Sequence, residues 1–325
     1  MQANAPRPAF AVLILLSVAG ADAQRASFVG RVDLVTMGVT VTDGRGRLVT
    51  DLAREHFEIV EDGQEQVVRL FATGEPAQAE TPLHLGLLLD VSESMGRDLP
   101  FVRTASIKIV RMLETAEDVT VVDFDSEVRS ARFGPRDFPR LVERIREQKV
   151  GGFTSLYDAI GVYLDGASTQ DGRKVALIYT DGEDTRSRLG LSELLDLLRA
   201  SDVTAYVVGA LEPQSGALRQ EQRLRLMRIA EATGGQAFFP TSAAGLDAIY
   251  AQVLAEIRAQ YTLGYLSSNG RDDGAWRRVE IRVTRPGARG YRVRSRPGYY
   301  ALYAPQAKAP VAPIAPGTFD ARPGR

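Results

Sequence analysis

Residues 84–96, HLGLLLDVSESMG, join a buried apolar run to a carboxylate and two hydroxyls. The run of residues 85–89 carries no charge and is typical of a strand covered on both faces of a parallel sheet. Asp90 ends this run, and Ser92 and Ser94 follow at alternate positions. Because a buried carboxylate without a partner is costly, the end of this strand should meet a helix N-terminus, a basic side chain or a metal ion.

Strands and helices alternate from residue 83 to about residue 260. Four further apolar runs predict strands at residues 119–124, 174–181, 204–211 and 236–239. Apolar residues at helical spacing lie between or after these runs, at residues 101–112, 191–198 and 246–257. This order predicts a doubly wound, mostly parallel, Rossmann-like α/β sheet covered by helices on both faces.

The two flanks of this region predict β structure. Residues 35–41 alternate apolar and small or polar side chains, and residues 279–283 alternate apolar and charged ones. Residues 61–63, Glu-Asp-Gly, separate two apolar runs as a hairpin turn would, and residues 74–82 have the composition of a linker. Because one or two hairpins are marginal in water, segments 24–82 and 261–302 should pack together as one small β-sandwich-like domain. The α/β domain, residues 83–260, would then be inserted between them.

The two ends of the chain carry their own signals. Arg7 precedes an apolar stretch that ends in Ala21-Asp22-Ala23, which predicts a secretory signal peptide over residues 1–23. The rival interpretation, an uncleaved anchor, is disfavoured because the stretch falls short of the roughly 20 apolar residues that span a bilayer. We therefore expect export to the periplasm, the cell surface or the medium, with no membrane span after cleavage. Residues 303–325, rich in Pro and Ala, are predicted to be a disordered tail.

Two further loops of the α/β domain offer oxygen atoms beside strand ends. Thr154 follows Gly151-Gly152 and precedes a helix, and Asp181 ends the strand that contains residues 174–180. Because ligands of open α/β sheets bind beyond the carboxyl ends of the strands, these loops should meet the one that holds Asp90. The donors are hard oxygens, and the chain has no cysteine, which excludes thiolate zinc sites and thiol catalysis. Few carboxylates and several hydroxyls suit Mg²⁺ best, and Mn²⁺ and Ca²⁺ are the other cations that this chemistry allows.

This constellation resembles the metal-ion-dependent adhesion site of von Willebrand factor type A domains. The matching residues are Asp90, Ser92, Ser94, Thr154 and Asp181, in the order that the family has them. The resemblance implies that the three hydroxyls bind the cation directly and that the aspartates bind directly or through water. It also implies a non-enzymatic interaction module whose protein partner supplies an Asp or Glu carboxylate to the ion. The flanking sequences FEIVEDG and RVRSRPGYYA are similar to those around such domains in exported bacterial proteins.

Several acidic residues besides the matched ones should lie near the same edge. For one of them, Asp158, the expected role is that of a structural hydrogen-bond acceptor. Phe153, which directly precedes Thr154, should form part of the rim, and Glu93 should face solvent. The full set of neighbouring acids comprises Asp123, Asp125, Asp158, Glu183 and Asp184.

Other functions have less support in the sequence. A formal net charge of −1 gives no electrostatic case for nucleic-acid binding. A metal-dependent hydrolase or phosphotransferase would need a base or nucleophile beside the ion, yet His56 lies outside the α/β domain and His84 at the opposite end of its strand. An Asp or Glu base stays open as the alternative. Nucleotide-binding glycine motifs are absent from the sequence. Polyanion binding would use a basic stripe on the C-terminal strands, for which a solvated strand face is the alternative: Arg278, Arg282, Arg285, Arg292, Arg294 and Arg296.

Overall fold

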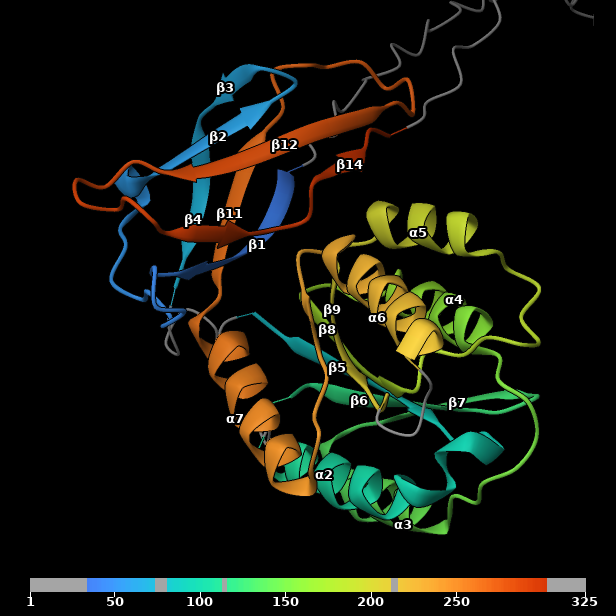
Figure 1. Ribbon diagram of the computed structural model, residues 1–325. Helices are drawn as coiled ribbons and strands as arrows, with labels where there is room; N and C mark the ends of the chain where they lie inside the picture. The colour runs from blue at the N-terminus through green and yellow to red at the C-terminus, as the bar shows by residue number, and fades with distance from the viewer. Residues whose placement is uncertain (1–33, 74–80, 113–115, 212–215, 303–325) are drawn as a thin grey trace, which may run out of the picture. The chain divides into compact units, whose positions relative to one another are not determined.

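A six-stranded sheet forms the centre of the α/β domain in the computed structural model, which describes residues 34–73, 81–112, 116–211 and 216–302. The strand order is β10-β9-β8-β5-β6-β7, and every pairing is parallel except that of β7 with β6 (Figure 1). The predicted mostly parallel sheet is therefore confirmed. The strands are β5 (Leu83–Asp90), β6 (Asp118–Phe124), β7 (Val128–Phe133), β8 (Arg173–Thr180), β9 (Val203–Gly209) and β10 (Gln236–Phe238).

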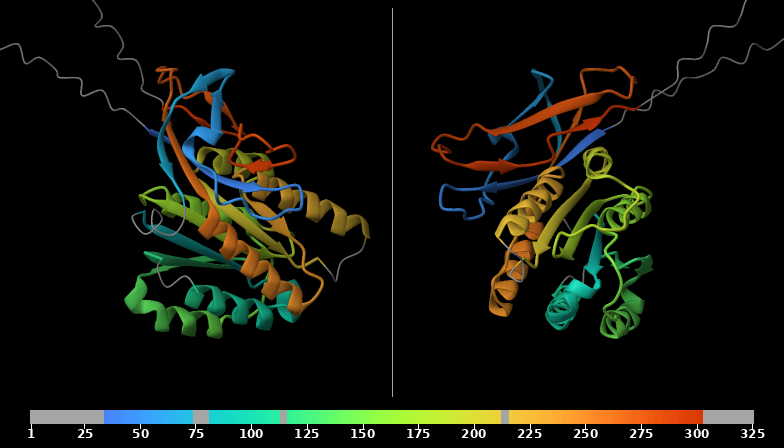
Figure 2. Two further views of the ribbon diagram at one scale, coloured as in Figure 1. Left: turned by 90° about the vertical axis from the view of Figure 1, so that its left-hand side faces the viewer. Right: turned by 45° about the vertical axis from the view of Figure 1, so that its right-hand side comes forward.

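Helices cover both faces of this sheet, as Figure 2 shows from two directions. One core contains Leu87 with side chains of α2 (Leu99–Met112), α3 (Phe138–Glu147) and α7 (Ala243–Ala259). The other contains Leu88 with side chains of α4 (Leu156–Ala167), α5 (Leu191–Ala200) and α6 (Gly216–Glu231). Leu87 and Leu88 are both fully buried, each contributing about 1.5–3 kcal/mol through removal from water. An apolar run without alternation is thus required, because both faces of β5 are covered.

The two flanks of the chain form antiparallel sheets together. β1 (Leu34–Thr42) pairs with β11 (Tyr261–Leu266), and β2 (Phe57–Glu61) pairs with β12 (Trp276–Val283). The first sheet has the order β13-β1-β11-β4 and the second β14-β12-β2-β3. Their shared core includes the alternating apolar residues of β1 and β12, as the sequence predicted. The remaining strands are β3 (Gln64–Gln66), β4 (Val68–Ala72), β13 (Arg292–Arg294) and β14 (Gly298–Tyr300).

Some elements differ from the sequence prediction. The hairpin turn joins β2 to β3 as expected, but the chain then crosses to the other sheet, where β4 pairs with β11. β7, α3 and α6 were not predicted. Charged side chains hide the apolar pattern of β7 and α6, whereas Phe138, Leu141 and Ile145 of α3 lie at helical spacing and could have been found in the sequence. Three short 3₁₀ helices complete the described elements: Arg54–His56, Glu93–Arg97 and Pro135–Asp137.

Parts of the sequence prediction fall outside the described residues. These are the signal peptide, most of the linker at 74–82 and the tail at 303–325. Within the described ranges, no helix has the length and apolar character needed to cross a bilayer.

Candidate metal centre

Three loops meet at the carboxyl end of the parallel sheet. Gly151 donates its backbone N–H to the Val91 carbonyl (2.9 Å), and Glu93 donates its N–H to the Gly152 carbonyl (3.3 Å). These bonds hold the loop after β5 against the loop before α4. The backbone N–H groups of Thr185 and Arg186 both donate to the Thr154 carbonyl at 3.0 Å. These bonds join the loop after β8, the third loop, to the loop before α4. The loops that carry the five predicted ligands are therefore fastened to one another.

In the Asp-x-Ser-x-Ser segment, Asp90 and the two serine hydroxyls are linked by hydrogen bonds. Asp90 Oδ1 accepts hydrogen bonds from the Ser92 backbone N–H (3.0 Å) and the Ser92 hydroxyl (2.5 Å). The hydroxyls of Ser92 and Ser94 are hydrogen-bonded at 3.1 Å. The Thr180 hydroxyl donates to Asp90 Oδ2 at 2.7 Å and accepts from the Gly182 N–H at 3.0 Å. One carboxylate and two hydroxyls thus lie together at the end of β5.

The remaining two predicted ligands are buried at the same edge. The Thr154 backbone N–H donates to the Thr185 hydroxyl at 3.1 Å, so both polar backbone groups of Thr154 are bound by the third loop. Asp181 directly follows β8, and its Oδ1 accepts the Glu183 N–H at 3.0 Å. Thr154 and Asp181 are buried, as Asp90 and Ser92 are, whereas Ser94 is exposed. The assignment of these five residues as metal ligands stays a prediction.

The Asp90 carboxylate is buried without an ion pair among the described residues. Burial raises the pKa of the Asp90 carboxyl to about 7, against the lowering effect of its hydrogen bonds from Ser92 and Thr180, and the nearby Asp181 charge raises it further. Burial and the Asp181 charge also raise the pKa of Asp98, against the lowering effect of the Arg97 charge. In the part of the chain that the structure describes, no Arg, Lys or His side chain forms an ion pair with Asp90. A divalent cation would relieve this energetic cost.

The donor chemistry fits a hard cation. No group of three or more Asp, Glu, His or Cys side chains that could hold a metal occurs among the described residues. The candidate site instead combines two carboxylates with three neutral hydroxyls. Oxygen donors of this kind suit Mg²⁺, which retains water molecules and accepts ligands from a partner. The residues present are therefore compatible with the cation that the sequence predicts.

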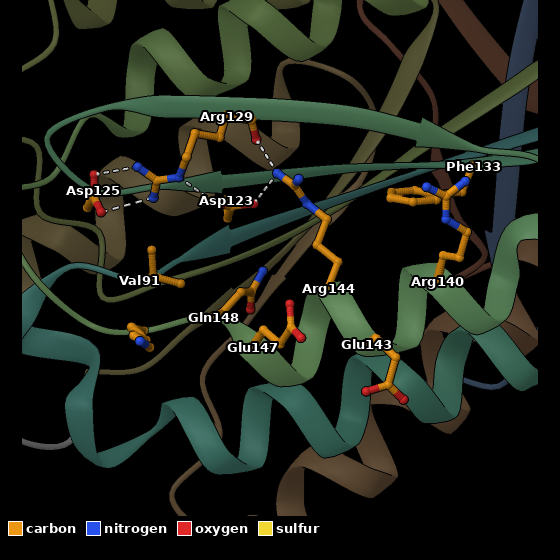
Figure 3. Close-up of a pocket in the computed structure, with 11 residues that line it drawn as sticks. Val91, Asp123, Asp125, Arg129, Phe133, Arg140, Glu143, Arg144, Glu147 and Gln148 are labelled. Carbon is orange, nitrogen blue, oxygen red and sulfur yellow. Dashed lines mark hydrogen bonds and ion pairs between the residues drawn. The ribbon is translucent and has the colours of Figure 1, made fainter.

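Asp123 and Asp125, which were expected near the same edge, form ion pairs with arginines. Arg129 donates to both oxygens of Asp125 (3.1 and 2.9 Å) and, through Nε, to Asp123 (2.7 Å), while Arg144 donates to Asp123 at 2.6 Å. Figure 3 shows this network in a groove of about 720 Å³ between β7 and α3. Although burial opposes the effect, the hydrogen bonds from Arg129 lower the pKa of Asp125. These two carboxylates are thus neutralised by the protein's own cations.

Asp158 and Asp184 brace the third loop. Asp158 accepts the backbone N–H groups of Arg188 and Leu189 at 3.0–3.1 Å, which is the structural role expected for it. Asp184 accepts the Ser187 hydroxyl (2.6 Å) and the Tyr157 N–H (3.2 Å). Sequence reasoning missed the contribution of Thr180 and Thr185, although both belong to the IYTDGEDT stretch that carries Asp181.

The features that the rival functions would use lie elsewhere or are paired. His84 is bonded to Asp118 (3.1 Å) and to the Asp171 carbonyl (2.8 Å), at the amino end of β5. Four arginines of the C-terminal stripe are bound within the protein. Arg282 pairs with Glu280 and Glu58, Arg285 with Asp51, Arg294 with Glu256, and Arg296 donates to the carbonyls of Ser201 and Thr36. This pairing argues against a polyanion site. Of these four arginines Arg282 is exposed, as on a solvated strand face, whereas the other three are half-buried.

The α/β domain matches a known protein family. The family model described as the von Willebrand factor type A domain matches residues 84–252, just over half of the chain. The comparison with curated proteins gave no match. The family match spans all six strands of the central sheet and the three loops of the candidate site.

Solved structures with a similar fold come from several bacteria. A von Willebrand factor type A protein from Catenulispora acidiphila is 13% identical with a TM-score of 0.45, covering 86% of this chain and 76% of that one. The vWF domain of the type V pili tip protein Mfa5 from Porphyromonas gingivalis is 12% identical with a TM-score of 0.45, covering 54% and 96%. The PilB minor pilin from Streptococcus sanguinis is 12% identical with a TM-score of 0.46, covering 57% of this chain and 63% of the pilin. The chain thus matches less than two thirds of the pilin's length.

Proposed function

Because the chain belongs to the von Willebrand factor type A family, we propose that it is a metal-dependent protein-binding module whose partner supplies an acidic side chain to a bound divalent cation. The observation that carries this proposal is the buried Asp90 carboxylate. It has no basic partner among the described residues, and it lies where three hydrogen-bonded loops bring hydroxyl and carboxylate oxygens together. The ligands in this proposal are Asp90, Ser92, Ser94, Thr154 and Asp181, and the ion is Mg²⁺, with Mn²⁺ or Ca²⁺ as substitutes.

The charge and geometry of the donors support an acidic partner. A divalent cation with neutral hydroxyls and at most two carboxylates retains affinity for a further anionic oxygen. Ser94 is exposed while the other candidate ligands are buried, so the accessible side of the ion would face solvent near Ser94. A carboxylate arriving from a partner would occupy that side.

The proposal includes export and a non-enzymatic role. The apolar stretch before residue 23 supports delivery to the periplasm, the cell surface or the medium. Neither histidine lies near the three loops, so the site offers no imidazole base. A metal-dependent hydrolase that uses a carboxylate base is the competing function, and turnover of an ester or phosphoester by the metal-loaded protein would favour it.

Calorimetric titration with Mg²⁺ tests the proposal. Asp90→Ala should abolish Mg²⁺ binding and retain the circular dichroism spectrum of the wild type. Asp137→Ala is the matched control, because Asp137 is half-exposed and precedes α3 at the end far from the three loops. Unchanged Mg²⁺ affinity in Asp90→Ala would remove the basis of the proposal.

A further inference from the structure

A large aromatic side chain is held in solvent directly beside the candidate metal site. Phe153 precedes Thr154 in the chain and is 60% exposed. Its backbone N–H donates to the Ser126 hydroxyl at 2.9 Å. Gly152 before it has φ +73°, and a Cβ there would lie 2.6 Å from Ser126 Oγ, so only glycine fits without displacement. The loop therefore fixes Phe153 in an exposed position.

A cation from another loop stands over this ring. The Arg186 guanidinium carbon is 5.9 Å from the centroid of the Phe153 ring, within the range of a cation–π contact. The Arg186 backbone N–H donates to the Thr154 carbonyl at 3.0 Å. Phe153 and Arg186 are thus attached to the same predicted ligand residue from two sides. Aromatic and arginine side chains at such exposed positions are those that contribute most to protein interfaces.

A groove lined by apolar and polar side chains begins at Arg186. The groove has a volume of about 1,170 Å³, and Ser126, Ser155 and Arg186 line it at the end near Thr154. From there it runs along α4 and α5, where Val162 and Leu197 are each 43% exposed. Further apolar lining comes from Val128, Leu164 and Leu189. The groove thus offers apolar contacts to a segment that extends from the candidate site.

We infer that the segment which supplies the acidic residue continues with apolar side chains, the first packed on Phe153 and the next in the groove between α4 and α5. This inference rests on the proposed function, because the acidic residue fixes where the segment begins. The charged side chains that line the groove are of both signs, so apolar contact rather than net charge selects its occupant. The partner is therefore a protein segment in which one Asp or Glu is flanked on one side by large apolar residues.

A peptide library displayed on phage tests the inference. The library carries four random residues on each side of a fixed Asp or Glu, binds to the full chain in Mg²⁺, and is eluted with EDTA. Enriched sequences should carry apolar residues on one side of the acid. Phe153→Ala and Val162→Ser should each weaken binding of an enriched peptide by about tenfold or more, while leaving Mg²⁺ affinity in calorimetry unchanged.

The control and the outcomes separate this inference from the proposed function. Leu224→Ser is the matched control, because Leu224 is 52% exposed on α6 and does not line the groove. Mg²⁺-dependent binding of library peptides without selection for apolar neighbours of the acid, or equal binding by Phe153→Ala, would overturn the inference and leave the proposed function intact. A library that shows no Mg²⁺-dependent enrichment would count against both, and binding that survives EDTA would contradict the proposed function itself.

Discussion

Replacing Asp90 by Asn should stabilise the metal-free protein at alkaline pH. The carboxyl has a pKa of about 7 in the folded chain and 3.8 as its reference value, because burial disfavours the charged form. Each pKa unit corresponds to about 1.4 kcal/mol, so the ionised carboxylate costs the folded state on the order of 4 kcal/mol above pH 7. Asp90→Asn removes the charge and keeps the size. The Thr180 hydroxyl must turn to accept from the new amide, which reduces the expected gain to roughly 2–4 kcal/mol.

The sign of this effect depends on pH in a defined way. A carboxyl whose folded pKa is raised binds more protons in the folded state between pH 4 and pH 7, so wild-type stability falls as pH rises through that window. The advantage of Asp90→Asn should therefore be full at pH 8, smaller at pH 6 and nearly absent at pH 4.

Denaturant unfolding at these pH values, in EDTA and in Mg²⁺, measures the prediction. In EDTA at pH 8, Asp90→Asn should have the larger free energy of unfolding. Mg²⁺ at about 100 times its dissociation constant should stabilise the wild type by about 2.7 kcal/mol and leave the variant unchanged. If Asp90→Asn is the less stable protein in EDTA at pH 8, the carboxylate is not a buried, uncompensated charge and the reasoning is wrong.

Three further predictions follow from the same geometry. The Mg²⁺ affinity measured by calorimetry should fall by up to tenfold per pH unit below pH 7, because the proton on Asp90 competes with the metal. An Mg²⁺ affinity that is the same at pH 8 and pH 6 would contradict this prediction. Thr180→Val should lower the free energy of unfolding by about 1–3 kcal/mol, because Asp90 and the Gly182 N–H both lose a buried partner, and denaturant titration showing less than about 0.5 kcal/mol would refute it. Gly152→Ala should cost roughly 1–2 kcal/mol in the same titration, since its positive φ and the closeness of Ser126 Oγ leave no room for a Cβ; a variant as stable as the wild type would show that the loop can relax.

The parallel strands and the flanking sheets could be predicted because their apolar patterns are local. β5 and β8 are uninterrupted apolar runs, and β1 and β12 alternate, so burial on two faces or one face is visible in the sequence itself. β7 could not be found in this way. Its sequence, VRSARF, places two arginines in an edge strand that needs only one neighbour. β7 forms a strand because it pairs with β6, and this pairing is not visible in the local sequence pattern.

The same distinction applies to the candidate site. The strand ends that carry Asp90 and Asp181 could be predicted, because parallel strands bring their carboxyl ends to one edge. The bond from the Thr154 N–H to the Thr185 hydroxyl joins residues 31 positions apart, and it depends on how two loops fold against each other. The neutralisation of Asp125 depends on Arg129, which lies in the unpredicted β7. Contacts that arise only in the folded chain therefore decide which of the nearby acids are paired with arginines.

The pairing of nearby acids within the protein bears on how an ion at the candidate site would bind a partner. Arginines neutralise Asp123 and Asp125, and backbone N–H groups engage Asp158, so these acids are not left to surround a cation. Had all of them faced the ion, its charge would have been satisfied by the protein alone. An ion held by Asp90 and neutral hydroxyls would keep its attraction for an external carboxylate. We therefore expect partner binding to depend on the acids that are paired within the protein as well as on those that could contact the ion.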